Sequence, residues 1–186
     1  MRPTWPKIIA ALAVLWSVFG GALWWAKAHR QTPERIVEFV GKNPLADKPP
    51  AERSKFIETV AARVNGLEFE QRQEMNQQKR LDSFWKGMSK TEQAHYLELV
   101  LPTGFKQMME NFNKMDPLKR RHLVEKAVKD MRQHAGDGPP ADADPEQVRK
   151  IVDEGLKSFY SDATIEAKMD ALPFLDELER TVKWSR

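Results

Sequence analysis

The sequence predicts an all-α protein, in which an N-terminal single transmembrane helix is followed by a small domain of helical hairpins or a helical bundle. Helix-capping residues recur along the chain, and the apolar residues between them recur at intervals of three and four. No segment alternates apolar and polar residues for long, so β-strands are not expected. Of the 186 residues, roughly 155 follow the N-terminal apolar segment, which is the size of one ordinary domain.

Residues 1–30 are predicted to form a membrane anchor. Ile8–Ala26 contains no charged residue, and a helix of these nineteen residues is about 30 Å long, the hydrocarbon thickness of a bilayer. Trp5 precedes this span, and Trp24 and Trp25 lie at its end, as interfacial aromatic residues do. The alternative is a cleaved signal peptide, because Ala26-Lys27-Ala28 has the small-x-small form of a cleavage site. The span exceeds the ~7–15 residues of a usual signal core, which favours an uncleaved signal-anchor.

Charge and cysteine content limit the ligands that the domain can bind and the compartment in which it can lie. The chain has 30 basic and 27 acidic residues, and three of the basic ones (Arg2, Lys7 and Lys27) flank the apolar span. The remaining chain is therefore balanced in charge, so no nucleic-acid binding is expected. The absence of cysteine excludes disulfides, cysteine-based zinc sites and thiol nucleophiles. It also suits an oxidising compartment, and we expect a single-pass protein of the bacterial inner membrane with a periplasmic soluble domain.

The first helices of the soluble part are predicted from their ends. Thr32-Pro33 has the form of an N-cap followed by the first helical residue, and Gly41 is a typical C-terminal stop. A proline-broken linker over 43–50 precedes a helix over 51–65, whose apolar residues share one face. A further helix, polar for most of its length, is expected over 68–86.

The middle of the chain carries the clearest capping signal. Ser89-Lys90-Thr91-Glu92 is a capping box, in which the Ser and Glu side chains each accept a hydrogen bond from a free backbone N–H. We expect the helix that it opens to stop at Pro102, and another helix to begin at Thr103. Asp116-Pro117 then begins a longer amphipathic helix.

The C-terminal part begins with a linker over 136–144, whose glycine and proline residues are incompatible with a helix. Asp144-Pro145 caps the next amphipathic helix, and a final helix is expected to begin near Pro173. The predicted organisation is an anchor over 1–30, a helical domain over 31–135, the linker over 136–144, and a C-terminal helical segment over 145–186. We expect this segment to pack on the helical domain.

Charge supports such a contact. Lys114–Arg132 holds seven basic and three acidic residues, whereas Asp142–Glu179 holds eleven acidic and four basic residues. Opposite charges on two surfaces favour their docking within one chain or between chains. The alternative is that both are ordinary solvated helix faces.

No catalytic, cofactor-binding or metal-binding residue is assigned from the sequence, and no cofactor is expected. His95/Glu98 and His122/Glu125 share the His-x-x-Glu spacing of metal sites in helical bundles. At about 100° per residue, however, each pair falls opposite the apolar stripe of its helix and should face water. Ser83-Phe84-Trp85-Lys86 has the Ser-x-x-Lys spacing of penicillin-recognising enzymes without their Ser-Asp-Asn and Lys-Thr-Gly elements.

The candidate partner-binding residues lie in the middle of the chain. Methionine is flexible and polarizable, so a helix face that is rich in it accommodates varied apolar partners. The alternative is that this face belongs to the core. A basic triplet follows in the next helix. The candidates are Met108, Met109, Phe112, Met115, Lys119, Arg120 and Arg121.

The leading hypothesis is a non-enzymatic, membrane-anchored helical interaction module of the bacterial envelope. It would be a scaffold, an accessory subunit or a chaperone-like binder, with the bilayer bound through Ile8–Ala26 and a protein partner or a second copy bound by the helical domain. One alternative is an envelope enzyme that acts on cell-wall glycan through carboxylates. Another is a cytoplasm-facing adaptor that uses the basic helix over 114–132.

Retention of the anchor is directly testable. N-terminal sequencing of the protein from the membrane fraction should find residues that precede Trp24, because an uncleaved signal-anchor keeps its whole apolar span. A mature chain that begins at His29 and is recovered from the soluble fraction would show instead that the segment is a cleaved signal peptide.

Overall fold

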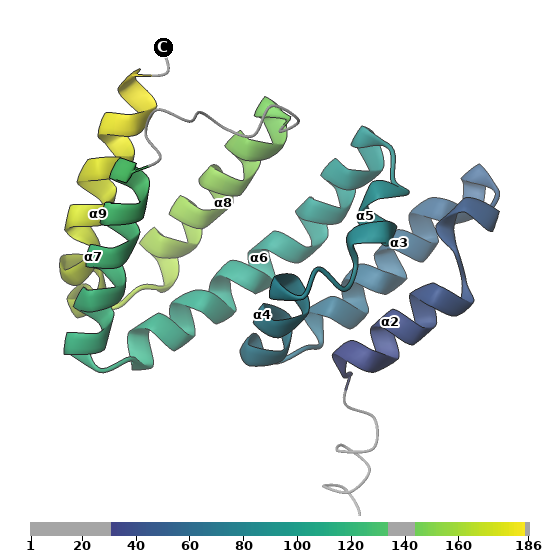
Figure 1. Cartoon of the computed structure of the whole chain (residues 1–186), viewed down its shortest axis with the longest axis horizontal. Helices are drawn as coiled ribbons and strands as arrows, with labels where there is room; N and C mark the ends of the chain where they lie inside the picture. Colours follow the sequence, from purple (N-terminus) through teal and green to yellow (C-terminus); the bar gives the residue numbers. More distant parts are fainter. Residues whose placement is uncertain (1–30, 134–143, 185–186) are drawn as a thin grey trace, which may run out of the picture.

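The computed structural model describes residues 31–133 and 144–184, with side chains described as far as residue 180, and all regular secondary structure in this part of the chain is helical (Figure 1). The elements are α2 (Pro33–Lys42), η1 (Leu45–Asp47), α3 (Pro50–Asn65), α4 (Phe69–Gln77), α5 (Asp82–Lys86), α6 (Lys90–Lys114), α7 (Pro117–Gln133), α8 (Pro145–Asp162) and α9 (Ile165–Trp184). The prediction of an all-α bundle is confirmed for these residues. The predicted transmembrane helix, Ile8–Ala26, lies outside them. Among the described helices, none combines the length and the apolar character that a membrane span requires.

The predicted N-caps are present because capping is local chemistry. Thr32 Oγ1 accepts a hydrogen bond from the backbone N–H of Arg35 at 3.4 Å, and Asp144 Oδ1 accepts one from Glu146 at 3.0 Å. Ser89 and Glu92 form the predicted capping box, with bonds of 2.8 and 3.3 Å. Each cap satisfies an N–H group that has no partner inside its helix.

Glu92 also joins the start of α6 to α3. Arg53 donates from Nε and Nη2 to the two carboxylate oxygens of Glu92, at 2.6 and 2.8 Å. This fork-to-fork geometry is the strong form of an ion pair. The Arg53 hydrogen bonds hold the pKa of Glu92 at about 2, below its ordinary value of 4.5.

Three predicted helix boundaries are wrong by several residues, and α2 ends at Lys42, just beyond the stop predicted at Gly41. α6 continues through Pro102, where a stop was expected, and α9 begins at Ile165 with Pro173 inside it. The helix predicted over 68–86 is instead two, α4 and α5, separated by a turn in which Lys79 has a φ of 50°. Non-glycine residues adopt this left-handed conformation rarely, which is why the polar sequence gave no sign of the break.

Pro102 is tolerated because other helices supply hydrogen bonds beside it. Proline lacks an N–H group and crowds the carbonyl four residues earlier, which costs a helix interior about 3 kcal/mol. Next to this defect, the carbonyl of Leu99 accepts a bond from Asn65 Nδ2 at 2.8 Å, and that of Val100 accepts one from Arg72 Nη1 at 3.2 Å. These donors come from α3 and α4, so the continuation of α6 is a tertiary effect.

The apolar residues form two separate cores. The N-terminal core is built by the segments from α2 to the first half of α6; its members are Ile36, Leu45, Phe56, Ile57, Val60, Ala61, Val64, Leu67, Met75, Phe84, Met88 and Val100. The C-terminal core is built by the second half of α6 together with α7, α8 and α9; its members are Met109, Val124, Val128, Phe159, Ala163, Ala167 and Ala171. The long helix α6 is therefore the element that both cores share (Figure 1).

The helices of the C-terminal half associate as two parallel pairs. α6 packs along α8 in the same direction, since Gln93 contacts Gln147 near their starts and Asn113 contacts Asp162 near their ends. α7 packs along α9, also in the same direction, and these two pairings are the most extensive of this half. The turns from α6 to α7 and from α8 to α9 consequently lie at the same end (Figure 1).

Arg72 is buried where α3, α4 and α6 meet. Its guanidinium donates to the carbonyls of Val64 and Val100, at 3.0 and 3.2 Å, and to Asn65 Oδ1 at 3.1 Å. Burial lowers its pKa from the ordinary value. A Cβ at Gly104 would come within 3.1 Å of Arg72 Nη1, so the glycine leaves the room that this side chain occupies.

Replacement of this arginine should weaken the fold strongly. Arg72→Ala removes all three hydrogen bonds and leaves a cavity, so we expect the free energy of unfolding of the full chain to fall by about 2–4 kcal/mol. Arg149→Ala is the matched control, because that side chain is 83% exposed; it should cost less than about 0.5 kcal/mol. Denaturant titration measures both variants, and equal small losses would contradict the role given to Arg72.

Candidate binding groove between two helix pairs

An apolar groove with a cavity of about 390 Å³ lies between the α6/α8 pair and the α7/α9 pair. Every helix of the two pairs contributes to it, and all sixteen lining residues are apolar or glycine. The lining residues are Phe105, Met108, Met109, Phe112, Leu123, Val124, Ala127, Ile151, Val152, Gly155, Leu156, Phe159, Ala171, Phe174, Leu175 and Leu178.

The groove is open to solvent. Met108 of α6, Leu123 of α7 and Ile151 of α8 are 37, 47 and 39% exposed, although each is a large apolar side chain that lines it. Single exposed apolar residues are ordinary on a protein surface, but a contiguous set in one concave site marks a place of interaction. The bottom is closed by buried residues of the C-terminal core, among them Met109 and Phe159.

Small residues create the space. A Cβ at Gly155 would come within 3.2 Å of the Phe105 ring, so this glycine allows α8 to approach α6 closely. Ala127 and Ala171 place only a methyl group where a larger apolar residue would fill the cavity. The sequence thus leaves a hollow in the centre of a four-helix arrangement, where interiors are ordinarily close-packed.

Ion pairs hold the α7/α9 wall together. Asp170 accepts from Arg120 Nη2 at 2.6 Å and from Arg121 Nε at 2.8 Å, and Glu177 accepts from Arg132 Nη2 at 2.8 Å. The Arg120 and Asp170 side chains are only 5 and 9% exposed. The hydrogen bonds from Arg121 and then Arg120 lower the pKa of Asp170 from its ordinary value.

Asn113 ties the end of α6 to the end of α8 and to the turn that leads into α9. Asn113, in the last turn of α6, donates to the carbonyl of Asp162 at 2.8 Å and accepts from the backbone N–H of Thr164 at 2.9 Å. Thr164 in turn caps α9, since its hydroxyl accepts from Ala167 at 3.2 Å. This local cap is the reason why α9 begins before Pro173.

Only some of the residues predicted to bind a partner lie in the groove. Met108, Met109 and Phe112 line the groove, whereas Met115 ends α6 and donates its backbone N–H to the Phe112 carbonyl at 3.2 Å. Their role in binding stays a prediction.

The basic triplet is also divided. Arg120 and Arg121 lie in the α7/α9 contact through Asp170, and Lys119 is exposed. The contribution of α8 and α9 to the groove was missed. Their apolar stripes were evident in the sequence, but the parallel pairing that turns these stripes toward α6 and α7 left no local signal.

The two histidine pairs differ in exposure, since His95 is half-buried against α3, where exposure to water was expected. His95 lies 3.5 Å from Glu58 and 3.8 Å from Glu98. His122 is exposed on α7. Within the residues that the structure describes, no group of three or more His, Cys, Asp or Glu side chains is placed to hold a metal ion.

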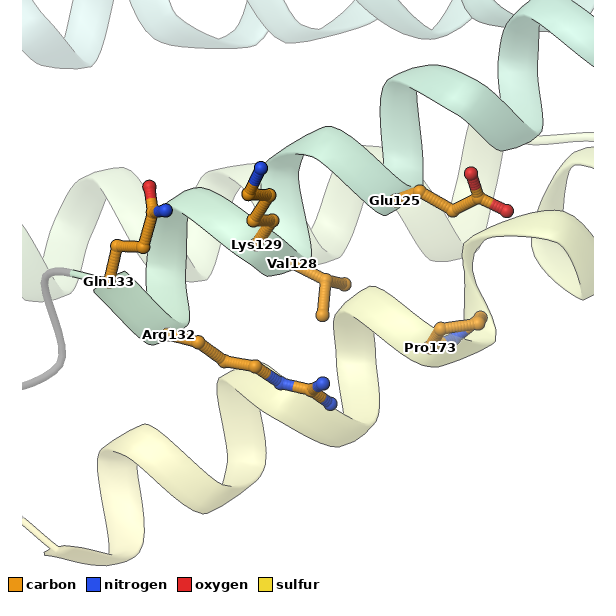
Figure 2. Close-up of a pocket in the computed structure, with 6 residues that line it drawn as sticks. All are labelled: Glu125, Val128, Lys129, Arg132, Gln133 and Pro173. Atoms are coloured by element: carbon orange, nitrogen blue, oxygen red, sulfur yellow. The ribbon is translucent and has the colours of Figure 1, made fainter.

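A second hollow, of about 470 Å³, lies on the outer side of the α7/α9 pair (Figure 2). Glu125, Lys129, Arg132 and Gln133 of α7 surround it together with Val128 and with Pro173 of α9. Figure 2 shows these side chains spread along the two helices rather than pointing to one centre. Arg132 is already paired with Glu177, so the apolar groove is the better candidate for a functional site.

Comparison with known protein families, with curated proteins and with solved structures gave no match.

The α7/α9 wall should loosen when its buried ion pair is broken. Asp170→Asn leaves the buried Arg120 guanidinium without a counter-charge, so we expect faster backbone hydrogen exchange in α9 and in the first turn of α7. Asp153→Asn, at a side chain that is 68% exposed, is the control and should leave exchange unchanged. Equal protection of α9 in both variants would show that the ion pair does not hold the wall.

Proposed function

We propose that this protein is a non-enzymatic binding module of the bacterial envelope, which holds an apolar segment of another protein in the groove between the α6/α8 and α7/α9 pairs. The observation that carries the proposal is a concave site of about 390 Å³ with a wholly apolar lining, part of which is exposed to water. Exposed apolar surface is unfavourable in a soluble domain, and its burial by a partner is the main source of binding free energy.

The character of the lining supports binding rather than catalysis. No lining residue carries a group for acid–base or nucleophilic chemistry. Met108 and Met109 lie side by side in the sequence on the α6 wall, and methionine adapts its shape to different apolar groups. A chaperone-like binder or an accessory subunit uses such a surface, because it must accept segments that differ in detail.

The proposed location rests on the N-terminal segment. An uncharged span of about 30 Å with tryptophan at both ends supports an inner-membrane anchor. The absence of cysteine supports a periplasmic position of the helical domain. Such a tether would keep the groove close to the membrane, where apolar segments of envelope proteins are inserted and assembled.

Methionine methyl NMR of the full chain can test the groove. The probe is a neutral helical peptide with leucine at i, i+3, i+4 and i+7 and glutamine elsewhere, titrated into the protein in lipid nanodiscs. The Met108 and Met109 methyl signals should shift, because both residues line the groove. Met75 and Met88 are internal controls, since they are buried in the N-terminal core. Saturating peptide that leaves Met108 and Met109 unshifted would refute the proposal.

A blocking variant strengthens this test. Ala127→Phe places a ring in the cavity. It should lower the affinity of the protein for the neutral peptide by at least about tenfold, a loss of about 1.4 kcal/mol or more in binding free energy. Gln133→Phe adds the same ring to an exposed position of the same helix, outside the groove. This control should bind as the unmodified protein does.

A further inference from the structure

We infer that the occupant of the groove is an amphipathic helix that carries acidic residues beside its apolar face, and that Lys119 and Lys126 bind those acidic residues. This inference rests on the proposed function and adds the shape and the charge of the partner. It is drawn from the lining of the groove, its length, its openness and the cations at its edge.

The lining requires a helical partner. Backbone N–H and C=O groups must be hydrogen-bonded when they leave water, but the sixteen lining residues offer no polar side chain. The walls are helices, whose backbone groups are bonded within each helix, so no strand edge is available to an extended segment. A helix satisfies its own backbone and presents only side chains to the groove.

The dimensions agree with two turns of helix. Lining residues extend from Phe105 to Phe112 on α6 and from Ile151 to Phe159 on α8. At about 1.5 Å per residue these stretches are about 10–12 Å long. Apolar anchors at i, i+3 or i+4 and i+7 of a partner helix span about 10 Å, so one such set covers the length of the groove.

The open side favours a helix over a single acyl chain. A small apolar ligand is ordinarily enclosed over most of its surface. Here Met108, Leu123 and Ile151 remain 37–47% exposed around the cavity. A partner helix has a second, polar face that can remain in water while its apolar face covers these three residues.

Two lysines without an ion-pair partner in the described chain indicate the charge that the partner helix should carry. Lys119 and Lys126 lie four residues before and three residues after Leu123, and are therefore its neighbours on the surface of α7. Both are exposed, and neither ammonium group forms an ion pair within the described chain. By contrast, Arg120, Arg121 and Arg132 of the same helix are paired with α9. Acidic residues that flank the apolar face of a partner would meet the two free lysines.

The experiment compares two labelled peptides of about 18 residues, a length at which helices form readily. Both carry leucine at i, i+3, i+4 and i+7; one has glutamate on either side of this face, and the other has lysine. Their affinities for the full chain in nanodiscs of zwitterionic lipid are measured by fluorescence anisotropy, with empty nanodiscs as the blank. The glutamate peptide should bind about tenfold more tightly, and less so at high salt.

Charge reversal identifies the cations. The Lys119→Glu/Lys126→Glu protein should bind the lysine peptide more tightly than the glutamate peptide. Lys55→Glu/Lys129→Glu makes the same change in net charge at two exposed lysines that do not neighbour Leu123. In this control the glutamate peptide should keep its advantage. An equal loss in both double variants would overturn the inference, because it would show a general effect of net charge.

The remaining outcomes separate this inference from the proposed function. If both peptides bind equally to the unmodified protein and Ala127→Phe weakens both, the groove binds apolar helices and the inference about charge is wrong. If Ala127→Phe changes neither affinity, the proposed function is wrong as well. A fluorescent fatty-acid probe is measured in parallel. Its tight binding, with no binding of either peptide, would make the groove a lipid site and overturn the inference.

Discussion

The buried guanidinium of Arg72 is the contact on which the arrangement of the two halves depends. It reaches the end of α3 through Val64 and Asn65, and the middle of α6 through Val100. At that point α6 contains Pro102, which has no N–H group to contribute to its own helix. The donors from Arg72 and Asn65 stabilise α6 beside this defect, and Gly104 leaves the room that the arginine needs. An unbroken α6 can then extend from the N-terminal core into the C-terminal one.

The continuity of α6 determines where the groove lies. Its first half closes the N-terminal core through Val100, and its second half supplies Phe105, Met108, Met109 and Phe112 to one wall of the groove. If α6 broke at Pro102, this wall would have no fixed relation to the N-terminal core. The opposite wall depends on a different kind of interaction, because Arg120 and Asp170 hold α9 against α7 through buried charges.

Part of this structure could be read from the sequence, and the limits follow from the range of the interactions. Thr32, Ser89 and Asp144 were identified as caps because an N-cap acts on residues two or three positions away. The stop at Pro102 was wrong because the compensating donors lie some thirty residues earlier in the chain. Only the α6 wall of the groove was predicted from the sequence. Met108, Met109 and Phe112 form a pattern within one helix, which the sequence shows directly. The groove residues of α8 and α9 are positioned by contacts between residues about fifty positions apart, which leave no local pattern.

The junction at Asn113 has a consequence for the stability of this half of the protein. The two helix pairs are joined at this end by two turns, by the bond of Asn113 to the Thr164 amide that precedes α9, and by the C-terminal core, to which all four helices contribute. Toward the opposite end the pairs diverge (Figure 1). A partner that contacts both walls of the groove would therefore bridge the two pairs, and its binding would raise the free energy of unfolding of this half of the protein.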